Sequence, residues 1–267
     1  MEKLIQANQS RQEQARALRQ WSVSDFLKTM EEARVYRAYI LYEQGQFQLS
    51  HPSLLKPLQS FCELSQDFAE HEGIFIGRED GLDAIFWAFV HDTRRGLSQG
   101  GLRFHAYQSV ADVLTDGMRL SQGMTRKNAL AGLHWGGGKG IMTLPRQYQH
   151  PSAFKSGPER AAYFEAYGRF VASLSGVYYT AEDVGTNTPD MSAIQSQNRF
   201  TTCIPSSHGG SGNPSPFTAR GVLRAMEAAW QAISGSPSLM GVKVAVQGTG
   251  NVGSPLIRYL DDLGAEV

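Results

Sequence analysis

The chain has 267 residues, which is enough for one large domain or two ordinary ones. Its 25 basic and 25 acidic residues give a formal net charge of zero, which argues against a nucleic acid or an anionic membrane as a partner held by bulk charge. The two cysteines, Cys62 and Cys203, are far apart and form no C-x-x-C pair, so the sequence indicates neither a disulfide framework nor a metal site.

The N-terminal segment is polar and charged, without the apolar region of a secretory signal. The longest apolar run is AIFWAFV, Ala84–Val90, and seven residues are too few to cross a bilayer. We therefore expect no membrane partner and a cytoplasmic location.

The first seventy residues are predicted to be helical. Residues 24–42, SDFLKTMEEARVYRAYILY, begin with apolar residues near helical spacing, and Ser24 is the candidate N-cap. Residues 71–92, HEGIFIGREDGLDAIFWAFVHD, predict two strands joined by a turn at Glu79–Gly81.

The following segments predict alternating helices and strands. An amphipathic helix is expected over SVADVLTDGMRLSQGM (109–124) and a second helix over ERAAYFEAYGRFVASL (159–174). VYYTAEDVG (177–185) predicts a strand that ends in a polar turn, and SGNPSPFTARGVLRAMEAAWQAI (211–233) predicts a loop that leads into a long helix.

The segment GMTRKNALAGLHWGGGKG, residues 123–140, contains two lysines, Lys127 and Lys139, the second within a run of glycines. It is not a Walker loop, because Leu133 stands where the first glycine is required and Gly140 where a hydroxyl is required. Taken alone, the pattern favours a flexible turn with an exposed lysine. The alternative is functional: glycines let backbone and substrate approach the amine, and burial lowers the pKa of the lysine so that it becomes a usable base.

The C-terminal segment LMGVKVAVQGTGNVGSPLIRYLDDLGAEV predicts a strand, a glycine turn, a helix and the start of a second strand. The turn is a G-x-G-x-x-G fingerprint at Gly248, Gly250 and Gly253, between a strand and a helix, which is the context of a dinucleotide site. The amides at the start of the helix, together with its dipole, favour a pyrophosphate there. An ordinary strand–turn–helix corner is the alternative.

An acidic residue that contacts the ribose is expected about 20 residues beyond the fingerprint, and only 19 residues follow Gly248. The sequence therefore reads as the N-terminal part of a longer enzyme or as a truncated relative of one, and it does not distinguish NAD from NADP.

Four co-linear blocks carry a family resemblance: GGLRFHAYQSVADVLTDGMRLSQGMTRKNALAGLHWGGGKG, YYTAEDVGTNTPDM, GSGNPSPFTARGV and VAVQGTGNVG. They resemble the glutamate/leucine/phenylalanine/valine dehydrogenases, most of all the leucine-type members, from about Glu72 to the end. The resemblance implies an α/β fold, with a substrate domain followed by a Rossmann dinucleotide domain and the active site in the cleft between them. We expect a helical N-terminal extension over residues 1–70, a substrate-binding and catalytic domain over 71–212, and the start of the Rossmann domain over 213–267.

The resemblance also implies an oxidoreductase: NAD- or NADP-dependent oxidative deamination of an L-amino acid to a 2-oxo acid and ammonia, by a homo-oligomer. It assigns Lys139 as the catalytic lysine that activates water, Asp183 as the proton shuttle to the substrate nitrogen, and Lys127 as the ligand of the substrate α-carboxylate. Residues implied to border the substrate are Gly100, Gly101 and Met124. Those implied to bind the cofactor are Thr218, Gly248, Gly250, Asn251, Val252 and Gly253.

The chemistry agrees with these roles, because the iminium left by hydride removal needs a nearby carboxylate to manage its protons. One cation can fix the substrate carboxylate, and a second can stabilise the developing oxyanion and act as a base when neutral. Taken singly, Lys127 would be interpreted as a solvated lysine at a helix end and Asp183 as a turn aspartate.

Two departures from the family pattern bear on specificity. Gln99 stands where glutamate-specific members commonly have a lysine, which counts against glutamate, and GIMTLP after Lys139 is one residue shorter than the leucine-type pattern. Two alternatives stay open: a non-catalytic relative with a structural or regulatory role, and a shikimate-type dehydrogenase, whose fingerprint should instead fall near mid-chain.

Overall fold

A computed structural model describes residues 2–267, with side chains from residue 9 onward. By internal contacts the chain divides into two compact units, Met1–Gly210 and Ser211–Val267. Within the described residues, no helix combines the length and apolar character needed to cross a membrane.

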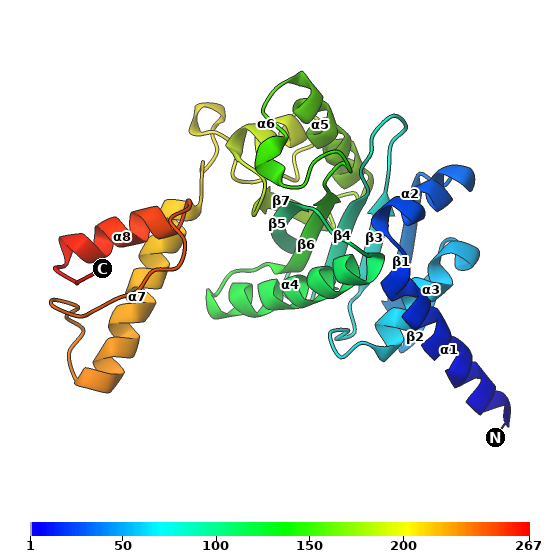
Figure 1. Ribbon diagram of the computed structural model, residues 1–267, viewed down its shortest axis with the longest axis horizontal. Helices are drawn as coiled ribbons and strands as arrows, with labels where there is room; N and C mark the ends of the chain where they lie inside the picture. The colour runs from blue at the N-terminus through cyan, green and yellow to red at the C-terminus, as the bar shows by residue number, and fades with distance from the viewer. Residues whose placement is uncertain (1) are drawn as a thin grey trace. The chain divides into compact units, whose positions relative to one another are not determined.

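The larger unit contains both helices and strands, which are interspersed along the chain (Figure 1). Its helices are α1 (Glu2–Gln20), α2 (Val23–Glu32), α3 (Pro52–Leu64), α4 (Val110–Leu130), α5 (Pro158–Ser173) and α6 (Thr188–Gln195). Its strands are β1 (Arg37–Glu43), β2 (Gln46–Leu49), β3 (Gly73–Gly77), β4 (Phe86–Asp92), β5 (Ser98–His105), β6 (Gly136–Thr143) and β7 (Tyr178–Glu182).

These strands form a seven-stranded mixed sheet in the order β2-β1-β3-β4-β6-β5-β7. The strands from β2 to β6 in this order pair antiparallel, whereas β6, β5 and β7 run parallel to one another. The parallel part is therefore the half of the sheet that contains both the glycine-rich segment and the strand leading to Asp183.

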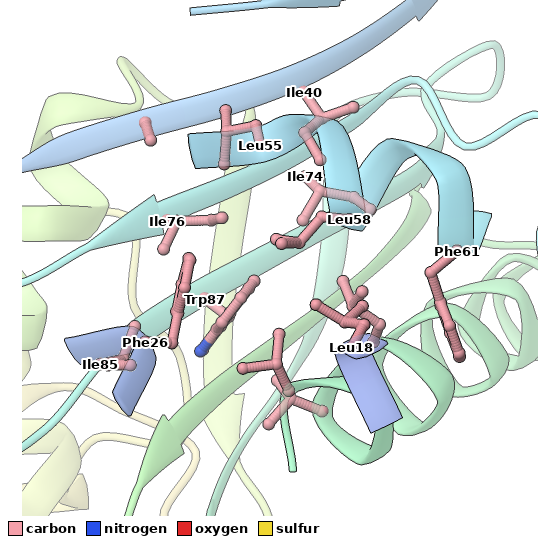
Figure 2. Close-up of a cluster of buried hydrophobic side chains, with 14 of the residues drawn as sticks. Leu18, Phe26, Ile40, Leu55, Leu58, Phe61, Ile74, Ile76, Ile85 and Trp87 are labelled. Carbon is pink, nitrogen blue, oxygen red and sulfur yellow. The ribbon is translucent and has the colours of Figure 1, made fainter. Parts of the chain in front are cut away.

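Two cores cover the two faces of the sheet. On one face, apolar residues of α1, α2, α3 and α4 pack around Trp87 and Ile141; Figure 2 shows part of this cluster, including Leu18, Phe26 and Trp87. On the other face, α5 and α6 pack around Phe86 and Phe104. Because successive strand residues point to opposite faces, buried residues of the central strands alternate between these two layers.

Helix α4 begins at a capping box, in which the Ser109 hydroxyl accepts from the amide of Asp112 and the Asp112 carboxylate accepts from the amide of Ser109. Its buried side packs on β4 and β6, where Gly117 lies directly against the ring of Phe89. The absence of a side chain at Gly117 allows the helix to approach the sheet closely.

The prediction of one helix over residues 24–42 is wrong in its second half, and the first seventy residues are not helical throughout. Helix α2 is capped by Ser22 rather than Ser24, ends at Glu32, and is followed by Arg34 in the left-handed region at φ 53°. Strand β1 then alternates buried Ala38 and Ile40 with exposed Tyr39, so period-two burial replaces helical spacing.

The other sequence predictions for this unit are confirmed: the β3–β4 hairpin, helices α4 and α5, and strand β7. In the smaller unit the predicted long helix is α7 (Ser215–Ser234), and the predicted glycine turn leads into α8 (Gly253–Asp262). The two predicted C-terminal strands are extended segments joined by one parallel bridge, Lys243 with Glu266, and Leu223 and Leu260 lie in the core of the unit.

Two glycines of α4 give a matched test of this packing. A methyl group at Gly117 would lie 2.2 Å from the Phe89 ring, so Gly117→Ala should destabilise the chain by about 1–3 kcal/mol. Gly123 has open space around the same position, so Gly123→Ala should stabilise the helix by up to about 1 kcal/mol. Urea unfolding of both variants measures the difference, and equal midpoints would contradict the packing described.

Candidate active site

The run of glycines around Lys139 lies in the buried strand β6, so the interpretation of these glycines as a flexible turn is wrong. All eight residues of β6 are buried, Lys139 among them. A methyl group at Gly137 would lie 2.0 Å from the Thr125 hydroxyl, and one at Gly140 would lie 2.2 Å from the hydroxyl of Tyr167. Glycine is needed here because helices and aromatic side chains pack directly on the backbone of the strand.

The neighbouring strand β5 approaches β6 equally closely. A methyl group at Gly100 would lie 1.7 Å from the carbonyl oxygen of Gly138, and one at Gly101 would lie 2.6 Å from Cβ of Asp183. The Asp183 side chain therefore lies over the bare backbone of Gly101, where any larger residue would displace it.

Asp183 follows β7 directly and is held by a tight turn. Its amide donates to the Thr186 hydroxyl at 2.8 Å, and this hydroxyl contacts the carbonyl oxygens of Asp183 and Leu102. Further along the loop, Arg160 donates to the Gly185 carbonyl at 2.8 Å. The Asp183 backbone is thus tied to both β5 and α5.

The Lys139 amine donates a hydrogen bond to the Asp183 carboxylate and forms an ion pair with it. The Lys139 side chain is 6% exposed and that of Asp183 is 25% exposed. Arg103 on β5 lies beside the pair, with Nε 3.5 Å from Asp183 Oδ2, and its Nη1 donates to the two carboxylate oxygens of Asp116 at 3.1 and 2.8 Å. The Tyr107 hydroxyl donates to Asp116 at 2.6 Å.

Burial and charge shift both members of the pair. Burial lowers the pKa of the Lys139 amine below its usual value, because the loss of hydration is only partly offset by Asp183. Burial also opposes ionisation of Asp183, but Lys139, a backbone hydrogen bond at Val184 and then Arg103 outweigh it and hold the pKa of the carboxyl below its usual value. The site therefore keeps an ionised carboxylate next to an amine that loses its proton more readily than a solvated lysine does.

The sequence-predicted substrate residues lie on the elements around this pair. Lys127 is exposed in the last turn of α4, and Met124 is half-buried one turn earlier. The neighbouring Asn128 donates to the carbonyl of Gly136 at 2.7 Å, so this end of α4 lies against the start of β6. Gln99, Gly100 and Gly101 lie on β5, next to β6.

The sequence-predicted cofactor residues all lie in the smaller unit. Gly248 has a positive φ of 92°, and a methyl group at Gly253 would lie 2.0 Å from the Gly248 carbonyl. The turn therefore needs both glycines, whereas Gly250 has open space around it. Thr218 is exposed near the start of α7, and Asn251 and Val252 directly precede α8.

Sequence reasoning missed Arg103, Tyr107 and Asp116. A signal was present in GGLRF, because Arg103 lies two residues after Gly101 and strand periodicity places the two on one face of the sheet. Asp116 lies on a separate helix, and the sequence carried no sign that it would meet Arg103.

Two family models of known proteins match this chain, and each falls almost entirely within one of its two compact units. A family model described as "Glu/Leu/Phe/Val dehydrogenase, dimerisation domain" matches residues 76–199, and one described as "Glutamate/Leucine/Phenylalanine/Valine dehydrogenase" matches residues 209–267. The chain is therefore an α/β protein in which a dehydrogenase dimerisation domain is followed by the start of a dehydrogenase domain. The chain belongs to the glutamate/leucine/phenylalanine/valine dehydrogenase family, which confirms the resemblance and fold class inferred from sequence.

Individual relatives agree. Leucine dehydrogenase of Geobacillus stearothermophilus is 46% identical over 71% of this chain and 49% of its own, and valine dehydrogenase of Streptomyces virginiae is 40% identical over 75% and 54%. The crystal structure of L-tryptophan dehydrogenase from Nostoc punctiforme superposes with a TM-score of 0.52 at 32% identity, over 73% of this chain and 52% of that one. The chain spans about half the length of the curated relatives it matches.

The space over Gly101 provides a test of the pair. In Gly101→Ala the new methyl group forces Asp183 away from Lys139, so the pKa of Asp183 should rise and that of Lys139 should fall further as each loses its partner. Carbon-13 NMR titration of labelled aspartate and lysine measures both changes, with Gly123→Ala as the control. Unchanged titration of both groups in a folded Gly101→Ala chain would contradict the geometry described.

Proposed function

We propose that the protein to which this chain belongs catalyses the NAD- or NADP-dependent oxidative deamination of an L-amino acid to a 2-oxo acid and ammonia. The observation that carries the proposal is the buried Lys139–Asp183 pair on the parallel half of the sheet, in a chain of the amino acid dehydrogenase family. A lysine with a lowered pKa next to an ionised carboxylate supplies a base and a proton carrier for general acid–base chemistry at a carbon–nitrogen bond.

We propose separate roles for the residues of this chain. Lys127, exposed at the end of α4, binds the substrate α-carboxylate and so positions the α-carbon. Asp183 exchanges protons with the substrate nitrogen. Lys139 in its neutral form takes a proton from the water that attacks the imine, and in its charged form stabilises the oxyanion that develops. Gly100, Gly101 and Met124 border the substrate.

The substrate class that we propose is an L-amino acid with an apolar side chain. The relatives described above are named for leucine, valine and tryptophan, and a further relative of 39% identity is a phenylalanine dehydrogenase. Gln99 agrees with this class, because an uncharged amide has no cation to offer a side-chain carboxylate.

The cofactor that we propose is NAD or NADP, which accepts the hydride from the substrate α-carbon. The fingerprint turn fits a dinucleotide: Gly248 takes the left-handed conformation, Gly253 permits a backbone approach that no side chain would allow, and α8 begins directly after it. Gly250, Asn251 and Val252 would face the pyrophosphate from this turn, and Thr218 would lie near the nicotinamide.

The domain arrangement is part of the proposal. Residues 71–212 would form the substrate and catalytic domain, with residues 1–70 as an N-terminal extension and 213–267 as the start of the Rossmann domain. A homo-oligomer is proposed because the matching family model is described as a dimerisation domain.

The direct assay is reduction of NAD or NADP by the natural protein with leucine, valine, phenylalanine, tryptophan and glutamate as substrates, with the intact mass measured alongside. We expect reduction with the apolar amino acids and little with glutamate. Absence of reduction with every amino acid and both cofactors would contradict the proposal.

Substitution of the two lysines should separate their roles. Lys139→Met should lower kcat by about 10²–10⁴-fold, because it removes the base and the cation at the reacting centre. Lys127→Met should mainly raise KM, because it removes binding that the ground state and the transition state share. Lys155→Met, which removes an exposed lysine with no role in the proposed site, is the matched control and should change neither constant. Equal loss from Lys139→Met and Lys155→Met would refute the assignment.

A further inference from the structure

One donor next to the candidate catalytic pair has no hydrogen-bond partner. Nε of Arg103 is buried and makes no hydrogen bond to any described residue. Asp183 Oδ2 lies 3.5 Å from this nitrogen, which is an ion-pair distance but too long for a good hydrogen bond. This same oxygen accepts from Lys139. Buried donors are nearly always paired, so an unpaired one at such a position calls for an explanation.

The rest of the guanidinium is fixed. Nη1 of Arg103 contacts both oxygens of the Asp116 carboxylate, and Tyr107 donates to the same carboxylate from the other side. The Arg103 side chain is 23% exposed. With Nη1 held by Asp116 on α4, the guanidinium places its buried, unpaired Nε beside Asp183.

In the proposed reaction the substrate nitrogen becomes a further partner of the Asp183 carboxylate, whose Oδ2 accepts from Lys139. When the carboxylate turns toward the substrate nitrogen, its contact with the Lys139 amine is weakened or lost. Asp183 is mostly buried, and burial alone would push a released carboxylate toward its neutral form. A second cation within reach avoids that cost.

We propose that Arg103 is a positioning residue whose Nε–H takes over the Asp183 carboxylate when Lys139 releases it. Asp183 then has two alternative partners, the Lys139 amine and the Arg103 Nε–H, separated by a small rotation of its side chain. The inference rests on the proposed function for its role in catalysis, whereas the exchange of hydrogen-bond partners is observable without turnover.

Arginine suits this position because its guanidinium offers several donors in a fixed plane. One N–H of Arg103 can donate to Asp116 while another lies beside Asp183 and is free to donate to it. A lysine carries its donors on one nitrogen at the end of a flexible side chain. Arg103→Lys would therefore keep the positive charge but would not contact Asp116 and Asp183 at the same time.

The charges around Asp183 are consistent with this role. The groups around Asp183 are Lys139 on β6 and Arg103 on β5, with Asp116 on α4 and Tyr107 in the loop before α4 next to Arg103. Burial opposes the charge on Arg103, but Asp116 and Asp183 hold the pKa of the guanidinium above its usual value. Arg103 also lowers the pKa of Lys139, so it favours the neutral amine that the proposed base step needs.

The test of the exchange uses the nitrogen-15 NMR signal of the Arg103 Nε–H in this chain. In Lys139→Met the carboxylate loses its first partner and should move to Arg103. The Hε proton should then shift downfield, and its exchange with water should slow by on the order of tenfold, the effect of one added hydrogen bond to a charged group. The double variant Lys139→Met/Asp183→Asn should lose most of this effect. An Hε signal that is the same in all three folded chains would overturn the proposal.

The catalytic role is tested in the active protein with three substitutions. Arg103→Gln should raise the pKa of Asp183 and lower kcat by about 10- to 100-fold, because the carboxylate is displaced and less readily ionised. Arg103→Lys should keep the Asp183 pKa low but recover only part of kcat. Arg119→Gln, which removes an exposed α4 arginine paired with Asp67, is the matched control and should change neither quantity.

The outcomes are distinguishable. If Arg103→Gln unfolds more easily but leaves the Asp183 titration and the pH profile of kcat unchanged, Arg103 only anchors α4 to β5 and the inference is wrong. If the unsubstituted protein reduces no cofactor with any amino acid, the proposed function fails, and the NMR comparison still decides whether Arg103 is the second partner of Asp183.

Discussion

The burial of Lys139 within a packed strand is the constraint on which the rest of the site depends. A buried ammonium is costly unless an anion faces it, and a carboxylate in such a place needs cations of its own. The chain meets both needs by bringing Asp183 from β7 and Arg103 from β5 to one face of the sheet. The glycines at 100, 101, 137 and 140 follow from this arrangement, because strands, helix and carboxylate approach more closely than side chains allow.

The division of the sheet into two layers explains why the site has this composition. One face of β5 and β6 is filled by the α5–α6 core, so residues such as Leu102 and Met142 are apolar and buried. On the opposite face α4 covers Gly137, and Asp116 on the same helix contacts Arg103. The charged side chains of β5 and β6 therefore lie at alternate positions, on the face that the α5–α6 core does not fill.

Much of this could be predicted from sequence where local signals are strong. The amphipathic spacing of residues 109–124 predicts α4, and the turn at Glu79–Gly81 predicts the β3–β4 hairpin. The residues of the Lys139–Asp183 pair were identified through a family resemblance, not through spacing, since 44 residues separate them. Strand β1 was missed because a helix-like pattern runs into it, and the strand nature of β6 because glycine usually indicates a turn. The Arg103–Asp116 contact depends on tertiary packing that no local pattern encodes.

In the proposed reaction, hydride leaves the α-carbon of an amino acid held on the face of the sheet that carries Lys139 and Asp183. The most direct test is to supply the natural protein with L-leucine carrying deuterium at that carbon, together with the oxidised cofactor, and to follow the deuterium by mass spectrometry. The account predicts that the deuterium appears on C4 of the reduced nicotinamide ring and that unlabelled ammonia and 2-oxo acid are released. Deuterium found in water, or reduced cofactor without deuterium, would contradict it.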